Sequence, residues 1–246
     1  MLANLIQKAL GSIGLGIIYL KDPIIDNDKE FLEIYSRCKP YTKTSRERMY
    51  SLYQAVRYIV SHDIPGELVE CGVWKGGSCM LIALTLQHMG ASRNLYLYDT
   101  FAGMTEPSED DVSIRKRKNA VSLWGKQQRG DVNEWCLSPL EEVRTNMKST
   151  GYAEEYIQFV QGRVEDTIPE QAPEKIALLR LDTDWYASTK HELIHLYPRL
   201  SRGGTLIVDD YGYWDGARKA VDEYFGDRPP LLVRVDEPGR VAIKIN

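Results

Sequence analysis

The chain has 246 residues, 43% hydrophobic and 27% charged, which are ordinary values for a globular protein and exclude a chain that is disordered throughout. One α/β domain is the usual outcome at this length, so we expect a single domain over residues 1–246. The formal net charge of -4 gives no reason to expect a nucleic-acid partner.

The first twenty residues are apolar, but they lack a basic n-region, and the run between Lys8 and Lys21 is too short to span a membrane. We therefore predict no transmembrane segment. The segment is interpreted as a helix that docks on the body or on a second subunit, which would make the chain a homo-oligomer through its N-terminal region. A peripheral membrane contact is the alternative. The four cysteines form no C-x-x-C pair or disulfide framework, which favours reduced thiols in a cytoplasmic protein.

Two more helices are expected before the first strand. Residues 28–38 (DKEFLEIYSRC) predict a short helix. Residues 44–62 (TSRERMYSLYQAVRYIVSH) predict an amphipathic helix capped by Thr44 or Ser45. Together with the N-terminus they form a helical cap over residues 1–62, which could cover the mouth of a site.

A glycine-rich loop follows the first predicted strand, Gly66–Val73, and opens a helix. The loop from Glu70 to Ser78 resembles but does not match G-x-G-x-x-G, and its glycines would let backbone amides approach a ligand. The second apolar run, Asn94–Tyr98, ends in Asp99. An acid at that tip is placed to accept hydrogen bonds from both ribose hydroxyls of a bound nucleoside. A helix cap at Asp99 is the alternative.

Residues 101–150 are polar and longer than an ordinary connection, which predicts a lid or an insertion. The basic run Arg115–Lys118 follows the acids Glu109–Asp111 and is interpreted as a solvated, locally compensated segment. Ile157–Val160 is the expected third strand, and Gly162–Thr167 follows it at the same sheet edge.

Paired acids follow two further apolar runs, Ile176–Leu181 and Thr205–Val208. The piece between them predicts a helix with Ser188 and Thr189 as candidate N-caps and Gly203-Gly204 as its end. Such a βαβ unit makes its strands parallel and open at the same edge, so the acids converge if the strands are neighbours. Gathered acids repel one another unless a cation or a proton-transfer role explains them, so a site is predicted. The acids are Asp182, Asp184, Asp209 and Asp210.

The crossover helix also carries His191-Glu192-Leu193-Ile194-His195, which fits H-E-x-x-H. Histidines one turn apart can bind Zn²⁺ with Glu192 as the base, so a zinc metallopeptidase is one alternative function. No clear third ligand follows, and two ordinary histidines on a partly exposed helix are the favoured interpretation.

The chain closes with a helix over residues 214–226 and a β-hairpin over residues 229–246 that turns at Glu237-Pro238-Gly239. Strands that alternate with helices before a terminal hairpin predict a doubly wound, Rossmann-like α/β sheet, mostly parallel with an antiparallel terminal strand. That ending is atypical for nicotinamide-binding domains and usual for class I methyltransferases.

A family resemblance is carried by five segments: GELVECGVWKGGSC, LYLYDTFAGM, GRVEDTIP, LLRLDTDWYAST and YPRLSRGGTLIVDDY. Together they resemble the macrocin O-methyltransferase family, the S-adenosylmethionine-dependent, metal-dependent sugar methyltransferases of macrolide and aminocoumarin biosynthesis. The resemblance extends roughly from Thr44 to Val221. It implies a catalytic core over residues 66–246 with a lid at about 101–150, and methyl transfer to a sugar hydroxyl of a glycosylated natural product or glycan precursor. The first forty residues and Pro107–Met147 match poorly, and an acceptor would be chosen there.

The resemblance also implies roles for single residues. Asp182, Asp209 and Asp210 would bind one Mg²⁺, and Asp184 would be the general base. Three carboxylates leave coordination positions for water or for two adjacent sugar hydroxyls. A helix cap is the alternative for Asp184. The residues that would hold S-adenosylmethionine are Glu70, Gly72, Trp74, Gly76, Gly77, Ser78, Asp99, Phe101, Gly162, Val164 and Asp182.

A non-catalytic alternative is a nucleoside-binding regulatory protein on a methyltransferase fold. It would keep the glycine loop and Asp99, but it has no need for four acids at the ends of the fourth and fifth strands. Their presence therefore favours catalysis.

Overall fold

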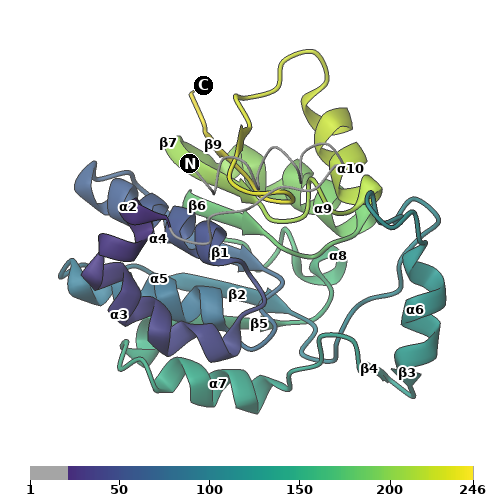
Figure 1. Ribbon diagram of the computed structural model, residues 1–246, viewed down its shortest axis with the longest axis horizontal. Helices are drawn as coiled ribbons and strands as arrows, with labels where there is room; N and C mark the ends of the chain where they lie inside the picture. The colour runs from purple at the N-terminus through teal and green to yellow at the C-terminus, as the bar shows by residue number, and fades with distance from the viewer. Residues whose placement is uncertain (1–21, 246) are drawn as a thin grey trace, which may run out of the picture.

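A seven-stranded sheet organises the fold, with the strand order β5-β2-β1-β6-β7-β9-β8 (Figure 1). The structure is a computed structural model and describes residues 22–245. The parallel strands are β1 (Glu67–Cys71), β2 (Leu95–Asp99), β5 (Ile157–Gln161), β6 (Ile176–Leu181) and β7 (Leu200–Val208). The hairpin adds β9 (Arg240–Ile243), antiparallel to β7, and β8 (Val233–Arg234), antiparallel to β9. The predicted mostly parallel sheet with an antiparallel terminal strand is confirmed.

Strand register explains why the acids of the sequence meet. Leu181 at the end of β6 lies beside Cys71 of β1 on one side and Val208 of β7 on the other. Cys71 in turn pairs with Tyr98 of β2. Four neighbouring strands therefore end at one level, and the residues that follow them emerge at the same edge of the sheet.

Helices cover both faces of the sheet (Figure 1). In β6, Leu178 belongs to the core under the N-terminal helices, and its neighbour Leu179 belongs to the core on the opposite face, because successive strand residues alternate. The first face carries α2 (Pro23–Asn27), α3 (Lys29–Cys38), α4 (Arg46–Ser61), α5 (Gly77–His88) and α7 (Leu140–Lys148). The opposite face carries α8 (Val164–Thr167), α9 (Tyr186–Leu196) and α10 (Asp215–Phe225). Single 3₁₀ turns lie at Lys39–Tyr41, Glu154–Tyr156 and Tyr197–Arg199.

The predicted ends of the crossover helix are wrong. The helix α9 begins after Trp185, and Ser188 lies inside it with its hydroxyl donating to the Trp185 carbonyl at 3.2 Å; Thr189 is likewise inside. Gly203 and Gly204 belong to β7, which starts at Leu200 because that residue already pairs with Ile176. By contrast, Ser45 is the N-cap of α4, one of the two predicted residues, and its hydroxyl accepts from the Arg48 amide.

The long connection after β2 contains α6 (Ala120–Gln127) and the short hairpin β3 (Gln128–Arg129) and β4 (Val132–Asn133). These elements stand apart from the helices that cover the sheet (Figure 1). The helix α7, which the sequence analysis placed inside the insertion, packs against α5 as an ordinary crossover helix. The action of residues 101–150 as a lid stays a prediction.

Between residues 22 and 245, the structure contains no helix that is both long and apolar enough to cross a membrane. The N-terminal helix and the subunit contact predicted for it lie outside the described residues. The four cysteines are free thiols, as expected.

Candidate active site

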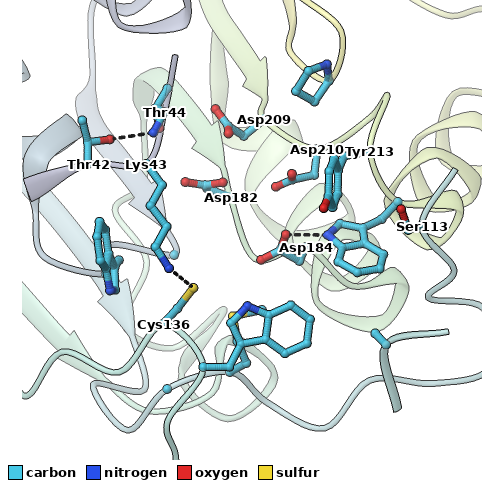
Figure 2. Close-up of a pocket in the computed structure, with 18 of the residues that line it drawn as sticks. Thr42, Lys43, Thr44, Ser113, Cys136, Asp182, Asp184, Asp209, Asp210 and Tyr213 are labelled. Carbon is cyan, nitrogen blue, oxygen red and sulfur yellow. Dashed lines mark hydrogen bonds between the residues drawn. The ribbon is translucent and has the colours of Figure 1, made fainter. Parts of the chain in front are cut away.

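A cavity of about 910 Å³ opens at the carboxyl ends of β1, β2, β6 and β7. Its inner wall carries the acids that follow these strands. The other walls come from residues 41–44 before α4, from the long connection between residues 103 and 136, and from Tyr213 and Trp214 before α10. In Figure 2 the acidic side chains point into this space from the sheet edge, and Lys43 and Cys136 face them from the opposite side.

Asp182, Asp209 and Asp210 lie together, with one carboxylate oxygen of each within 4.8 Å of the others. The three residues come from the ends of β6 and β7, where the neighbouring register places them. Carboxylate oxygens in this number are the hard donors that Mg²⁺ prefers. The geometry brings together the three residues predicted to bind metal, and their role as ligands stays a prediction.

Two arginines that were not predicted to belong to the cluster, the buried Arg180 and the partly buried Arg48, neutralise part of it. The Arg180 guanidinium, on β6, donates to Glu70 at 2.7 Å and to Asp209 at 2.7 Å, and it lies 2.8 Å from Asp182. Arg48 on α4 donates to Asp209 and, at 3.0 Å, to Asp236 of the closing hairpin. The sequence held a signal for Arg180, because a charge within an otherwise apolar buried strand requires a buried partner.

The cluster contains more carboxyl groups than cationic groups. Five carboxylates, those of Glu70, Asp182, Asp184, Asp209 and Asp210, face the two guanidinium groups. Burial raises the pKa of Asp182 and of Asp210, and neighbouring carboxylates add to the rise. One oxygen of Asp210 is buried without a hydrogen-bond partner among the described residues. A divalent cation would satisfy that oxygen and offset the surplus charge, so the residues present fit a metal ion.

Asp184 is held by Trp214, whose indole N–H donates to its carboxylate at 2.7 Å (Figure 2). Asp184 has φ 68°, an uncommon conformation for a residue other than glycine, and so it does not continue the extended chain that would place it beside Asp182. Burial raises the pKa of Asp184 to about 7, with a further contribution from the charge of Asp182. The alternative role as a helix cap is wrong, because Trp185 is the N-cap of α9.

Three indole rings form an apolar wall beside Asp184. The ring of Trp185 lies 5.4 Å from that of Trp135 and 5.0 Å from that of Trp214. Trp135 and Trp214 line the cavity. Trp135 lies within the predicted lid, residues 101–150, whereas Trp185 and Trp214 were not predicted to belong to the site.

Asp99 organises the loop between β1 and α5. One of its carboxylate oxygens accepts from the amides of Val73 and Trp74 at 2.7 and 3.0 Å, and the other accepts from the Phe101 amide at 2.8 Å. Trp74 and Phe101 both have positive φ, which these hydrogen bonds stabilise. Asp99 lines the cavity and caps no helix, so the helix-cap interpretation is wrong.

The predicted cofactor residues are distributed over the site unevenly. Gly76 and Phe101 line neither the large cavity nor the small one beside it. Glu70 is buried, and its carboxylate oxygens accept from Arg180 and from the Cys79 thiol. A small adjoining cavity, of about 60 Å³, is lined by Gly162 and Val164, next to Asp99. The predicted residues that line the larger cavity are Glu70, Gly72, Trp74, Gly77, Ser78, Asp99 and Asp182.

Residues 41–44 pack closely against the start of α5. A Cβ atom added at Gly77 would lie 2.6 Å from the Tyr41 carbonyl oxygen and 2.7 Å from Cβ of Thr42. We therefore expect Gly77→Ala to lower the free energy of unfolding by about 1–3 kcal/mol, the usual cost of overpacking. Urea unfolding measures it, with Gly125→Ala as the control, because a Cβ at Gly125 meets open space. Equal stability of Gly77→Ala and the wild type would contradict this packing.

The zinc interpretation of the H-E-x-x-H motif is wrong. Glu192 is fully buried and accepts from the Thr183 hydroxyl at 2.9 Å, so it faces the protein interior. His191 contacts the Ile168 carbonyl oxygen at 2.9 Å. Within residues 22–245 the one group of three or more potential metal ligands is the acidic cluster.

Comparison with known proteins gives consistent matches over most of the chain. A sequence profile of the family described as Macrocin-O-methyltransferase (TylF) matches residues 35–232. The chain is 33% identical over 202 residues to demethyldecarbamoylnovobiocin O-methyltransferase of Streptomyces niveus, covering 81% of this chain and 74% of that protein. It is 34% identical over 187 residues to 8-demethyl-8-(2,3-dimethoxy-alpha-L-rhamnosyl)-tetracenomycin-C 4'-O-methyltransferase of Streptomyces olivaceus, covering 76% and 68%.

A solved structure, that of the O-methyltransferase NovP, is similar with a TM-score of 0.73 and 31% identity, covering 84% of this chain and 83% of that one. The calicheamicin methyltransferase CalS11 is similar in fold, with a TM-score of 0.63 at 18% identity over 92% and 94% of the chains. The predicted class I methyltransferase fold is confirmed.

Proposed function

The chain belongs to the macrocin O-methyltransferase family and is an S-adenosylmethionine-dependent O-methyltransferase, and we propose that it methylates a sugar hydroxyl with Mg²⁺ bound at the acidic cluster. The acceptor would be a glycosylated natural product or a glycan precursor. The observation that carries this proposal is the convergence of Asp182, Asp209 and Asp210 beside Asp184 in one cavity.

The cavity suits S-adenosylmethionine on the side of α5. No side chain caps the N-terminus of this helix, and the loop before it has positive φ at Gly72 and Trp74, which turns its backbone toward the cavity. A Cβ atom at Gly72 would lie 2.0 Å from the Asp182 carbonyl oxygen, so only glycine fits between the two strand ends. Asp99 lines both cavities and would accept from the ribose hydroxyls.

The sugar acceptor is supported by the relatives. The Streptomyces olivaceus protein is named as a 4'-O-methyltransferase of a rhamnosyl-tetracenomycin. An acceptor with adjacent hydroxyls would also suit a hard cation held by three carboxylates.

Each group in the site would have a separate role in methyl transfer. Bound S-adenosylmethionine would supply a methyl group already activated by its sulfonium centre, and bound Mg²⁺ would supply Lewis acidity and a template for two hydroxyls. Asp184 would accept the proton of the acceptor hydroxyl as that oxygen forms its bond to the methyl carbon and the carbon–sulfur bond breaks. Trp214 orients Asp184 for this transfer, and the wall of indole rings keeps water from the reacting atoms.

Metal removal tests the proposal. After chelation, methyl transfer to a panel of sugars and glycosides should stop, and added Mg²⁺ should restore it. Asp182→Asn should lower Mg²⁺ affinity by at least about 10–100-fold, the loss that follows even when only an outer partner of a ligand is removed. Cofactor binding, measured by calorimetry, should be largely intact, because Asp182 is only one of the residues predicted to hold S-adenosylmethionine.

Asp131→Asn, on an exposed turn, is the control for this variant. Near-wild-type turnover of Asp182→Asn would overturn the metal assignment. Tight cofactor binding without transfer to any sugar would instead favour the regulatory alternative.

A further inference from the structure

Side chains of both charges line the cavity, and they come from different elements. Its carboxylates belong to the ends of β1, β2, β6 and β7. Three lysines line it from the long connection: Lys116 and Lys118 before α6, and Lys126 in the last turn of that helix. Carboxylates of the sheet edge and lysines of the long connection therefore line the same cavity, where an acceptor would lie.

The acids that precede the basic run do not neutralise it. Glu109 accepts from the Asn119 side chain at 3.0 Å, and Asp110 accepts from Lys219 at 2.8 Å. Asp111 is buried and accepts from the Tyr186 amide at 2.8 Å. The local compensation expected from the sequence is therefore wrong for this segment.

Alternate residues of the basic run Arg115–Lys118 line the cavity. Arg115 pairs with Glu237 at 3.6 Å, and Arg117 pairs with Asp215 at 2.6 Å; neither arginine lines the cavity. The intervening Lys116 and the following Lys118 line it, and the ion pairs of the described residues include neither of them, nor Lys126. Two of the four positive charges are thus used to fix the turn, and the other two remain for the cavity.

The turn that bears these lysines is fixed relative to Asp184. Its own closure is a hydrogen bond from the Ser113 amide to the Lys118 carbonyl, at 2.9 Å. The Ile114 amide donates to the Tyr213 carbonyl, and the Asp215 amide donates to the Val112 carbonyl, each at 2.9 Å. These bonds flank Trp214, which holds Asp184, so a group bound by the lysines would have a set position relative to the base.

We propose that the acceptor is a sugar that carries a phosphate or diphosphate ester. This inference rests on the proposed sugar methylation and narrows its substrate class. Lysines bind phosphate as point charges, and three of them match the two negative charges of a diphosphate diester better than the single charge of a carboxylate. The acids repel the ester from the sheet edge, so the ester lies at the lysine wall while a hydroxyl of the same sugar reaches Asp184.

A matched series of acceptors tests the proposal. A panel of hexoses and 6-deoxyhexoses is offered as methyl glycosides, as 1-phosphates, as nucleoside diphosphate esters and as short-chain prenyl diphosphate esters. We expect the phosphorylated forms of one sugar to have a KM at least about tenfold lower than its methyl glycoside, at similar kcat. The preference should weaken as salt rises, because salt screens exposed charges. The ester with the lowest KM identifies the source of the phosphate.

The triple variant Lys116→Gln/Lys118→Gln/Lys126→Gln should lose this KM difference and keep the kcat of the methyl glycoside. The control variant Arg129→Gln/Arg144→Gln/Lys148→Gln removes the same charge from exposed ion pairs outside the cavity and away from this turn, and should keep the difference. Equal KM for methyl glycoside and esters in the wild type would overturn the proposal, and so would an unchanged preference in the lysine variant.

Binding of inorganic pyrophosphate separates this inference from the proposed function. Calorimetry should detect pyrophosphate binding to the wild type and to the control variant, with affinity at least about tenfold weaker in the lysine variant. If no sugar of any form is methylated, the proposed function fails while this measurement still decides the anion site. If the methyl glycosides are methylated and pyrophosphate binds all three proteins equally, only the phosphate inference fails.

Discussion

Substituting Asp184 by asparagine is expected to lower kcat by about 10²–10⁴-fold, the usual contribution of a positioned general base. Asparagine keeps the shape of the side chain and can still accept from the Trp214 indole, but it cannot take the proton of an acceptor hydroxyl. Single-turnover methyl transfer from labelled cofactor measures the chemical step. Cofactor and Mg²⁺ affinities should change little, because Asp184 is not among the three clustered acids that are proposed to bind Mg²⁺.

Two further variants test whether the loss of kcat in Asp184→Asn comes from the loss of the base itself. Asp227→Asn, on an exposed turn outside the cavity, should retain near-wild-type kcat. Trp214→Phe removes the N–H that orients Asp184 together with part of the indole ring, and its kcat should lie between those of the wild type and Asp184→Asn. A wild-type kcat for Asp184→Asn would remove it from the mechanism, and loss of folding in that variant would assign it a structural role instead.

The second large effect is expected for stability. Arg180→Met should lower the free energy of unfolding by about 3–5 kcal/mol, because it leaves the buried Glu70 without its ion-pair partner and Asp209 with Arg48 alone. Urea unfolding of the metal-free protein measures the loss. Arg46→Met, which breaks a partly exposed pair with Asp26, should cost no more than about 1 kcal/mol.

A second substitution and a change of pH test the cause of this loss. Glu70→Gln in the Arg180→Met background should recover part of the stability, because it removes one uncompensated charge. Burial raises the pKa of Glu70 and Arg180 opposes the rise, so the variant should hold this carboxyl protonated in the folded state. A group with a raised folded pKa loses its contribution as pH increases, and the deficit should therefore be larger at pH 8 than at pH 5. A deficit independent of both changes would contradict the buried-charge explanation.

The sheet was predictable because its strands carry local signals. Ile176–Leu181 has the predicted bounds, since a short apolar run that ends in acids admits few other interpretations. The crossover helix was mispredicted at both ends for tertiary reasons. Ser188 and Thr189 are residue types that often cap helices, but both are buried within α9. The Gly203-Gly204 pair is typical of a helix end, but here it lies inside β7, because the strand already pairs with β6 at Leu200.

The acidic cluster was predictable from chain order, and its neutralisation was not. Asp182, Asp209 and Asp210 meet because neighbouring parallel strands end at one level. Arg48 contacts Asp209 from a helix that lies far away in sequence, and no local sequence pattern predicts such a contact. The alternation of the basic run was likewise hidden, because it depends on Glu237 and Asp215 in other elements.

Arg48 joins the beginning and the end of the described chain at the cluster itself. Its guanidinium links α4, which precedes every strand, to Asp209 and to Asp236 in the last hairpin. If the amino-terminal helices of this enzyme were replaced by those of a relative, the residues at positions 48 and 236 would have to be exchanged together, because Arg48 and Asp236 form an ion pair. A chimera that carried only one of them would lose the ion pair between Arg48 and Asp236 and, without Arg48, one of the two cationic partners of Asp209.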